Sequence, residues 1–408
     1  MCRVELLSPA SDRVSLTAAI RAGADSVYFG VKQLNMRATA KNFELSELPV
    51  IVKICHDNNV KAYLTLNTIV YDDELTVLNK ILDVSESCNV DAIIAWDFAV
   101  ISEARNRNIP VHISTQASVS NYEALKFFAK QGAVSVNLAR ELSIERVKKI
   151  IDNVNRDGLN VDIEVFCHGA MCVSISGRCF MSQEIFRKSA NRGECIQPCR
   201  REYLVCDTVD GHHLIVGQDY IMSPKDLCTL RIIDKLIAIG VKRLKIEGRN
   251  RNAEYVKVVT ECYRRAIDAI AAGKFDNLLV ESLIRKLKTV YNRGLHTGFY
   301  LGVPTADDFS REYGSVATEE KHYVGFVQKF YKRINVAEIK IETGELTIGD
   351  RIMIQGPTTG VVEQTVGSME IEHQPIQCVK KGQAVGIKSE YVLRPNDRVF
   401  VIRQKKGR

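Results

Sequence analysis

Cysteine is concentrated in one short stretch of this chain. Five of the twelve cysteines lie between Cys167 and Cys199, and four of them, Cys172, Cys179, Cys195 and Cys199, are separated by six, fifteen and three residues. Four thiolates this close together can enclose a soft metal ion or an iron–sulfur cluster. Spacing alone leaves three interpretations open: a 4Fe-4S cluster, a zinc ion, or unrelated buried thiols. Zinc is the lesser metal alternative, because structural zinc sites usually contain two close cysteine pairs and only Cys195 and Cys199 form one.

The cysteine stretch is also rich in positive charge. Cations near cysteine favour the thiolate form, and they attract phosphate or dicarboxylate groups. We therefore name Arg178, Arg192 and Arg200 as candidate substrate-binding residues. The structural alternative is a cation-rich loop that simply faces solvent.

The elements that position these residues follow a repeated pattern of a short apolar run and a helical segment. Eight such units over the first part of the chain predict a (β/α)8 TIM-type barrel. A doubly wound open sheet is the runner-up, but no G-x-G-x-x-G follows the first run, so a dinucleotide-binding version has little support. The expected strands are Val4–Leu7, Ser26–Gly30, Lys61–Leu66, Asp91–Trp96, Val111–Ser114, Val134–Leu138, Val161–Phe166 and Lys242–Glu247. We assign residues 1–315 to this barrel, with a cysteine-rich insertion at 167–203.

Polar residues follow several of the expected strands. In a barrel of this type the loops after the strands build the active site. The residues at these positions are Asn67, Asp97, Gln116, Arg140, Glu247 and Arg249. Asn67 and Gln116 could hydrogen-bond a base edge or a carboxylate, and Arg249 could bind an anion. Lys245 and Glu247 alternate onto one face of the eighth strand, so an ion pair between them is the structural alternative to substrate binding by Lys245 and catalysis by Glu247.

Two further candidates lie in or near the seventh strand. Glu164 is a candidate catalytic carboxylate, with a structural ion pair or hydrogen bond as the alternative. His168 is a candidate catalytic base. Cys167 and His168 are neighbours on a strand and are expected to point to opposite faces, so only one of them can face the mouth of the barrel. No G-x-S-x-G or H-E-x-x-H motif of a hydrolase occurs in the sequence.

The pattern changes after about residue 315. Short alternating runs broken by Gly, Pro and Asp predict a small antiparallel β-barrel domain over residues 321–408. This part carries 15 Lys and Arg against 9 Asp and Glu, a net charge of +6 out of +7 for the whole chain. The C-terminal domain is therefore expected to contact a polyanion, with a well-solvated basic domain as the alternative.

The composition is that of a soluble globular protein. No run approaches the roughly 18 apolar residues that span a bilayer, and the N-terminus lacks the apolar core of a signal peptide. We expect a cytoplasmic protein without membrane contact. In a reducing compartment, clustered cysteines favour metal binding over disulfides.

Several sequence motifs resemble those of the U32 peptidase family, the collagenase-like peptidases. The resemblance is carried by EVFCHGAMCVSISGRCFMS, SANRGECIQPCR, MSPKDLC, LKIEGR and NRGLHTGFY, and by ELLSPA, GADSVYFG and HISTQAS near the start. It covers about 300 residues and the C-terminal β-domain. Some family members are similar to RNA- or quinone-hydroxylating proteins that hold a 4Fe-4S cluster on four cysteines, which here would be Cys172, Cys179, Cys195 and Cys199.

The resemblance is best to the members that help form 5-hydroxyuridine in tRNA with prephenate. It implies an enzyme that hydroxylates a tRNA uridine without oxygen, with prephenate or another small dicarboxylate as co-substrate and possible help from a second family member as protein partner. A peptidase, as the family name says, is the first alternative. The second is a non-catalytic RNA-binding protein with a structural metal site.

Overall fold

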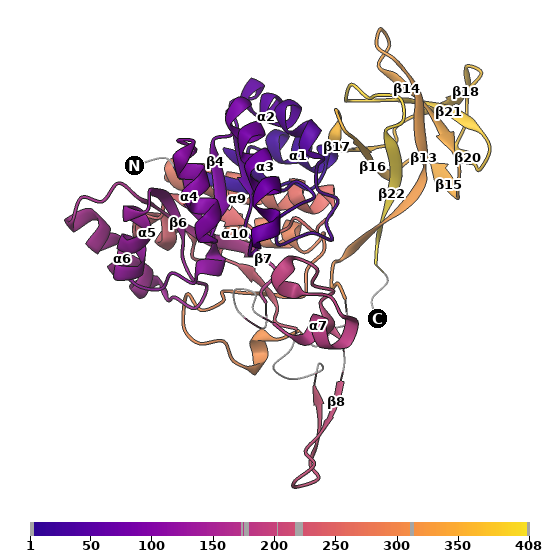
Figure 1. The fold of residues 1–408 in the computed structure, drawn as a ribbon. Coiled ribbons are helices and arrows are strands. Elements are labelled where there is room, and N and C mark those ends of the chain that lie inside the picture. The colour runs from indigo at the N-terminus through magenta and orange to yellow at the C-terminus, as the bar shows by residue number, and fades with distance from the viewer. Residues whose placement is uncertain are drawn as a thin grey trace.

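The computed structural model describes residues 4–172, 174, 179–201, 203–216, 223–310 and 314–405. Eight parallel strands form a closed barrel, because β11 pairs with both β7 and β1 (Figure 1). The strands are β1 (Glu5–Pro9), β2 (Ser26–Phe29), β3 (Lys61–Thr65), β4 (Ala92–Ala95), β5 (Val111–Ile113), β6 (Ala133–Asn137), β7 (Asp162–Gly169) and β11 (Arg243–Ile246). The predicted (β/α)8 barrel is confirmed, and the open-sheet alternative is wrong.

Helices surround the barrel and bury their apolar faces against it. They are α1 (Arg13–Arg21), α2 (Leu48–Asp57), α3 (Leu75–Ser87), α4 (Phe98–Asn106), α5 (Tyr122–Lys130), α6 (Ile144–Arg156), α8 (Ile233–Ala238), α9 (Ala253–Ala271) and α10 (Asn277–Leu287). Several begin at a side chain that caps the helix: Asp12, Asn121, Ser143 and Asp276 each accept a hydrogen bond from the N–H three residues on. No helix among the described residues is long and apolar enough to cross a membrane.

The cysteine-rich stretch lies between β7 and β11. Its elements are α7 (Met181–Phe186), two 3₁₀ turns (Ala190–Arg192 and Pro198–Arg200) and the hairpin of β8 (Tyr203–Cys206) and β9 (His213–Val216), which projects away from the barrel (Figure 1). The chain then returns through β10 (Asp226–Cys228), which pairs antiparallel to β7 and parallel to β12 (Leu295–His296).

The C-terminal part is antiparallel β-structure, as expected. Eight strands lie in the order β17-β16-β22-β13-β14-β21-β18-β19, and β15 pairs with β20. Alternate residues of these strands fill a second hydrophobic core. The strands are β13 (Glu319–Tyr331), β14 (Val336–Ile341), β15 (Glu345–Thr347), β16 (Arg351–Gly356), β17 (Gly360–Thr365), β18 (Met369–Ile371), β19 (Gln374–Pro375), β20 (Cys378–Lys380), β21 (Ala384–Lys388) and β22 (Arg398–Gln404).

The C-terminal sheet is packed against the barrel helices α1 and α9 (Figure 1). A small apolar cluster joins Ala18 and Ala253 to Met353 and Phe400. Beside it, Thr17 Oγ1 donates a hydrogen bond of 2.6 Å to the carbonyl of Pro357. These contacts fix the C-terminal strands relative to the barrel.

Candidate functional site

A polar cavity lies at the mouth of the barrel, where the carboxyl ends of the strands meet. It brings together Asn67, Gln116, Lys245, Glu247 and Arg249, which the sequence placed at or near strand ends. Its other lining residues are Tyr28, Met36, Arg37, Thr65, Ile94, Ser114, Thr115, Arg140 and Phe166. This is the position at which barrels of this type carry their active sites.

Positive charge dominates this cavity. Arg37, Arg140, Lys245 and Arg249 line it, together with one carboxylate, that of Glu247. Arg37 Nη2 lies 3.1 Å from Glu247 Oε1. Burial opposes ionisation of Glu247, but the charges of Arg37 and the neighbouring arginines outweigh it and lower its pKa. With Glu247 ionised, the cavity still has an excess of cations that suits an anionic ligand.

Arg249 is held rigidly at the bottom of the cavity. The residue is only 4% exposed, and Nη1 donates to Thr65 Oγ1 at 2.8 Å and to Asn35 Oδ1 at 3.2 Å. Burial lowers the pKa of Arg249, and the nearby charge of Arg37 adds to this shift. Because an arginine starts from such a high pKa, the guanidinium stays charged at neutral pH.

Lys245 pairs with Glu164 and not with Glu247. Lys245 Nζ lies 2.9 Å from Glu164 Oε1, both side chains are buried, and Asn137 Nδ2 donates to the same carboxylate oxygen at 2.7 Å. The expected alternative of a Lys245–Glu247 pair is therefore wrong, since Glu247 pairs with Arg37. The contacts of Glu164 are those of a structural counter-ion inside the barrel.

The four clustered cysteines line an adjoining cavity. Cys172, Cys179, Cys195 and Cys199 surround it, and Met36, Arg37, Thr115, Gln116 and Arg140 line both this cavity and the mouth cavity. Backbone N–H groups point at two of the sulfurs: Met181 N lies 3.4 Å from Cys179 Sγ, and Gln197 N lies 3.4 Å from Cys195 Sγ.

This donor set fits a soft metal centre. Sulfur ligands on several sides of one cavity, with N–H donors to the sulfurs, are the usual surroundings of an iron–sulfur cluster. Within the described part of the chain, no group of three His, Cys, Asp or Glu side chains is already gathered closely enough to hold a single metal ion. The fit therefore rests on the donor type and the shared cavity.

The cysteine stretch is seated directly on the barrel mouth. Gly193 adopts φ +85°, and a Cβ at this position would lie 2.3 Å from the carbonyl oxygen of Asn35. Its own carbonyl accepts from Ala38 N at 3.1 Å, and Thr68 Oγ1 donates to the carbonyl of Asn191 at 3.2 Å. Only glycine permits this close approach of the two loops.

His168 lies outside both cavities. It belongs to β7, is 2% exposed and packs against α9, where its Nδ1 lies 3.3 Å from the hydroxyl of Tyr263. Burial lowers the pKa of His168 to about 3, so the ring is neutral. Cys167 is the extra residue of a β-bulge opposite Lys245, and its Sγ donates to the Lys245 carbonyl at 3.4 Å. Neither residue lines the mouth cavity, so His168 does not lie where a catalytic base would be expected.

The remaining candidates hold local structure or lie elsewhere. Arg192 binds Glu74 and the carbonyl of Ile69 and stacks on Tyr71. Arg200 donates to the carbonyl of Pro224 at 3.0 Å. Asp97 caps α4 by accepting from Ala99 N. Arg178 lies outside the described residues.

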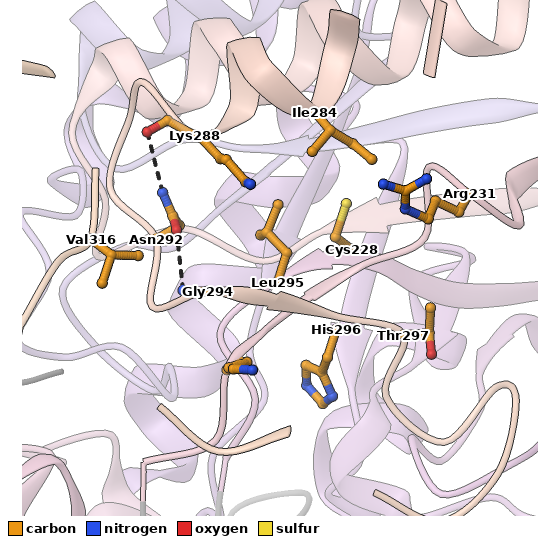
Figure 2. A pocket seen from close by; sticks show the side chains of 11 residues that line it. Cys228, Arg231, Ile284, Lys288, Asn292, Gly294, Leu295, His296, Thr297 and Val316 are labelled. Carbon is orange, nitrogen blue, oxygen red and sulfur yellow. Dashed lines mark hydrogen bonds between the residues drawn. The ribbon is translucent and has the colours of Figure 1, made fainter. Parts of the chain in front are cut away.

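A third cavity, of about 410 Å³, lies on the outside of the barrel next to α10. Figure 2 shows Cys228 there beside Ile284 and Leu295, with Lys288 and Arg231 nearby. Burial raises the pKa of the Cys228 thiol. Cys228 therefore lines a different cavity from the four clustered cysteines.

Sequence reasoning missed Tyr28 and Arg37. Tyr28 belongs to the second strand, and Arg37 belongs to the loop that follows it. Arg37 obeys the same rule as the other candidates, since it comes after a strand end. The signal was weak because seven residues separate Arg37 from that strand, so nothing in the sequence indicated that the loop turns back over the mouth.

Comparison with known proteins identifies one family. The similar proteins carry two kinds of name, some as a collagenase or protease and others as a tRNA hydroxylation protein. The model of Peptidase family U32 matches residues 11–310. The chain is 44% identical to a collagenase of Porphyromonas gingivalis, covering 97% of both chains, and 44% identical to a protein of Methanocaldococcus jannaschii named as an uncharacterized protease, covering 99% of both. It is 31% identical to tRNA hydroxylation protein P1 of Bacillus subtilis, covering 92% of this chain and 91% of that one.

Proposed function

Because the chain belongs to peptidase family U32, in which relatives similar over nearly their whole length carry RNA-hydroxylating as well as protease names, we propose that it is an enzyme that hydroxylates RNA. The specific proposal is formation of 5-hydroxyuridine in a tRNA, with a 4Fe-4S cluster as cofactor and a small dicarboxylate such as prephenate as co-substrate. The resemblance of the sequence motifs to the tRNA-hydroxylating family members is the basis for naming this product, this cluster and this co-substrate.

The observation that carries the proposal is that the cysteine cavity and the mouth cavity share lining residues. Arg37, Gln116 and Arg140 face the four cysteines on one side and the cationic mouth on the other. A group bound at the cysteines would therefore lie next to an anion or a base bound in the mouth. This arrangement suits a redox reaction on an anionic or polynucleotide substrate.

Each set of residues has a distinct role in this proposal. Cys172, Cys179, Cys195 and Cys199 would hold the cluster, which when bound supplies one-electron redox chemistry. Arg37, Arg140 and Arg249 provide guanidinium groups for a carboxylate or phosphate.

The amides of Asn67 and Gln116 can hydrogen-bond the edge of a base. Asn67 Nδ2 lies 3.5 Å from Gln116 Oε1, so both amides face the same space. Glu247 is an ionised acceptor beside them. A single-stranded loop base can enter such a mouth without opening a helix.

The decisive measurement is mass spectrometry of tRNA nucleosides from cells with and without the gene. We expect 5-hydroxyuridine to fall on deletion, to return with the wild-type gene and with Cys378→Ala, and not to return with Cys195→Ala. Cys378 lies in the C-terminal domain and is a matched control for the loss of one thiol. An unchanged nucleoside profile on deletion would overturn the proposal.

A peptidase is the competing function, because the relatives at 44% identity carry protease names. The geometry offers it little support in the described residues. Burial raises the pKa of the Cys167 thiol, and the neighbouring His168 contacts Tyr263 instead of that thiol. Peptide hydrolysis by purified protein that persists after removal of the metal would favour this alternative.

A further inference from the structure

A large cleft, of about 750 Å³, lies between the barrel helices and the C-terminal sheet, beside their contact. Its barrel side is formed by the start of α9 and the end of α10, and its other side by β13, β16, β17 and the last strand, β22. Six cationic and four acidic side chains line it: Arg251, Arg285, Lys286, Lys321, Arg351, Lys405, Glu254, Glu319, Glu320 and Glu363. The cleft therefore has an excess of two positive charges.

Some of these charges hold the two sides of the cleft together. Lys321 Nζ lies 2.7 Å from Glu254 Oε1, which joins β13 to α9. Within the sheet side of the cleft, Arg351 of β16 binds Glu319 of β13 through both terminal nitrogens at 2.8 Å. All four are paired within the protein, so they shape the cleft and are not free to bind a ligand.

Two arginines in the cleft are different. Within the described residues, the guanidinium groups of Arg251 and Arg285 make no ion pair or hydrogen bond that would occupy their donors. Arg251 is half-buried and lies 3.8 Å from the centroid of the Tyr291 ring, which fixes its position. Arg285 is exposed on α10. An arginine fixed in this way presents a preorganised fork to a phosphate.

The segment between β11 and α9 contributes residues to both the mouth cavity and the cleft, although the two share no lining residue. Glu247 and Arg249 line the mouth, and Arg251, two residues further along, lines the cleft. Tyr255 Oη donates to the carbonyl of Glu247 at 3.0 Å, and Arg251 N donates to the carbonyl of Gly248 at 2.8 Å. These contacts tie the segment that lines the mouth to the residues that line the cleft.

We propose that this cleft binds the phosphate backbone of the RNA next to the nucleotide held in the mouth. Arg251 and Arg285 contact phosphates, and Tyr291 positions Arg251. The inference rests on the proposed RNA substrate. Two guanidinium groups that no carboxylate of the described residues pairs with suit the phosphates of an RNA backbone.

The test uses the full-length, metal-loaded protein and an unmodified tRNA transcript, with binding measured by filter retention over a range of salt. Each phosphate contact on a single strand contributes about 0.7 to the slope of log K against log salt. We expect the double variant Arg251→Gln/Arg285→Gln to lower that slope by about 1.4 and to reduce affinity at low salt by roughly 10-fold or more. Tyr291→Ala should weaken binding, and Tyr291→Phe should restore it.

Arg146→Gln is the matched control. Arg146 is exposed on α6, on the far side of the barrel from the C-terminal sheet (Figure 1). It should keep wild-type affinity and slope. Thermal melting of each variant separates loss of binding from loss of fold.

The outcomes distinguish this inference from the proposed function. If wild-type cells contain the 5-hydroxyuridine and the double variant binds tRNA with wild-type affinity and slope, the cleft inference is refuted while the proposed function stands. An equal loss in the Arg146 control would also refute it. If deleting the gene leaves the nucleosides unchanged, the proposed function itself fails, whatever the cleft variants do.

Discussion

The buried pair of Glu164 and Lys245 gives the sharpest test of how the barrel interior is built. Their side chains are 2% and 5% exposed, and 2.9 Å separates Glu164 Oε1 from Lys245 Nζ. The change Glu164→Gln keeps the size of the side chain and its contact with Asn137 but removes the negative charge. It leaves the Lys245 ammonium buried without a counter-ion.

The expected cost follows from that burial. Removing one partner of a buried pair typically destabilises a protein by about 3–5 kcal/mol. Lys245 Nζ also lies 4.7 Å from the centroid of the Tyr28 ring, and such a cation–π contact is worth about 0.5–2 kcal/mol. Because this contact survives the substitution, we expect a loss near the lower end, about 3 kcal/mol. Replacing both residues, with Lys245→Met, should recover most of it.

The loss should depend on pH in a defined direction. Burial lowers the pKa of Lys245 and Glu164 opposes that shift, so removing the carboxylate lowers the folded-state pKa further. Between this value and the unfolded pKa of about 10.4, the unfolded chain binds more protons than the folded one, and stability rises with pH. The loss of stability caused by Glu164→Gln should therefore be largest near neutral pH and should become smaller as the solution becomes alkaline.

Urea denaturation of the wild type, both single variants and the double variant measures the coupling between the two residues. A stable Glu164→Gln variant with the wild-type midpoint but little activity would refute the structural role and return Glu164 to the catalytic candidates. A double variant no more stable than Glu164→Gln would show that the loss does not arise from the unpaired ammonium.

Three further predictions concern the cofactor, the mouth and the buried histidine. Anaerobically purified wild type and Cys378→Ala should contain about four irons per chain with equal sulfide, and Cys195→Ala should contain neither; stoichiometric zinc in the wild type would contradict this. Arg249→Lys should reduce activity roughly 10-fold or more in protein that remains folded, because it keeps the charge but loses the two-point contact; wild-type activity would place the substrate elsewhere. Between pH 6.5 and about 3, only the unfolded chain protonates His168, so stability should fall with decreasing pH by up to about 1.4 kcal/mol per unit. The variant His168→Gln should fall less steeply over that range, and equal slopes would show that His168 contributes nothing.

The barrel could be predicted from the sequence because its signals are local. Strands of a parallel barrel are buried on both faces and read as short apolar runs, and each expected run overlaps an observed strand. The turns after α1, α5 and α8 contain Gly23, Gly132 and Gly240, all of which have positive φ. Because the loops after the strands of such a barrel build its active site, Asn67, Gln116 and Arg249 could be named as candidate site residues from their positions after expected strands.

Pairing between side chains could not be predicted, because it depends on strand register and irregularities. Glu164 and Lys245 are 81 residues apart and meet only because β7 and β11 are neighbours in the closed barrel. The bulge at Cys167 interrupts the alternation on which the expectation for His168 rested. The position of Arg37 could not be predicted, because contacts with the distant cysteine stretch fold its loop back over the mouth.

The charge of the mouth cavity bears on which of the two functions named among the relatives, peptidase or RNA hydroxylase, suits this chain. A thiol peptidase needs a reactive thiolate beside a base, whereas the thiol of Cys167 is buried and donates to the carbonyl of Lys245. The mouth is lined by four cations and one carboxylate. Because Lys245 is paired with Glu164 and Arg37 with Glu247, the charges of Arg140 and Arg249 remain in excess, and four more thiols line the adjoining cavity. A neutral peptide bond would gain little from that excess charge, while a phosphate or dicarboxylate would be bound by it. The charge of the cavity therefore favours an anionic substrate over a peptide.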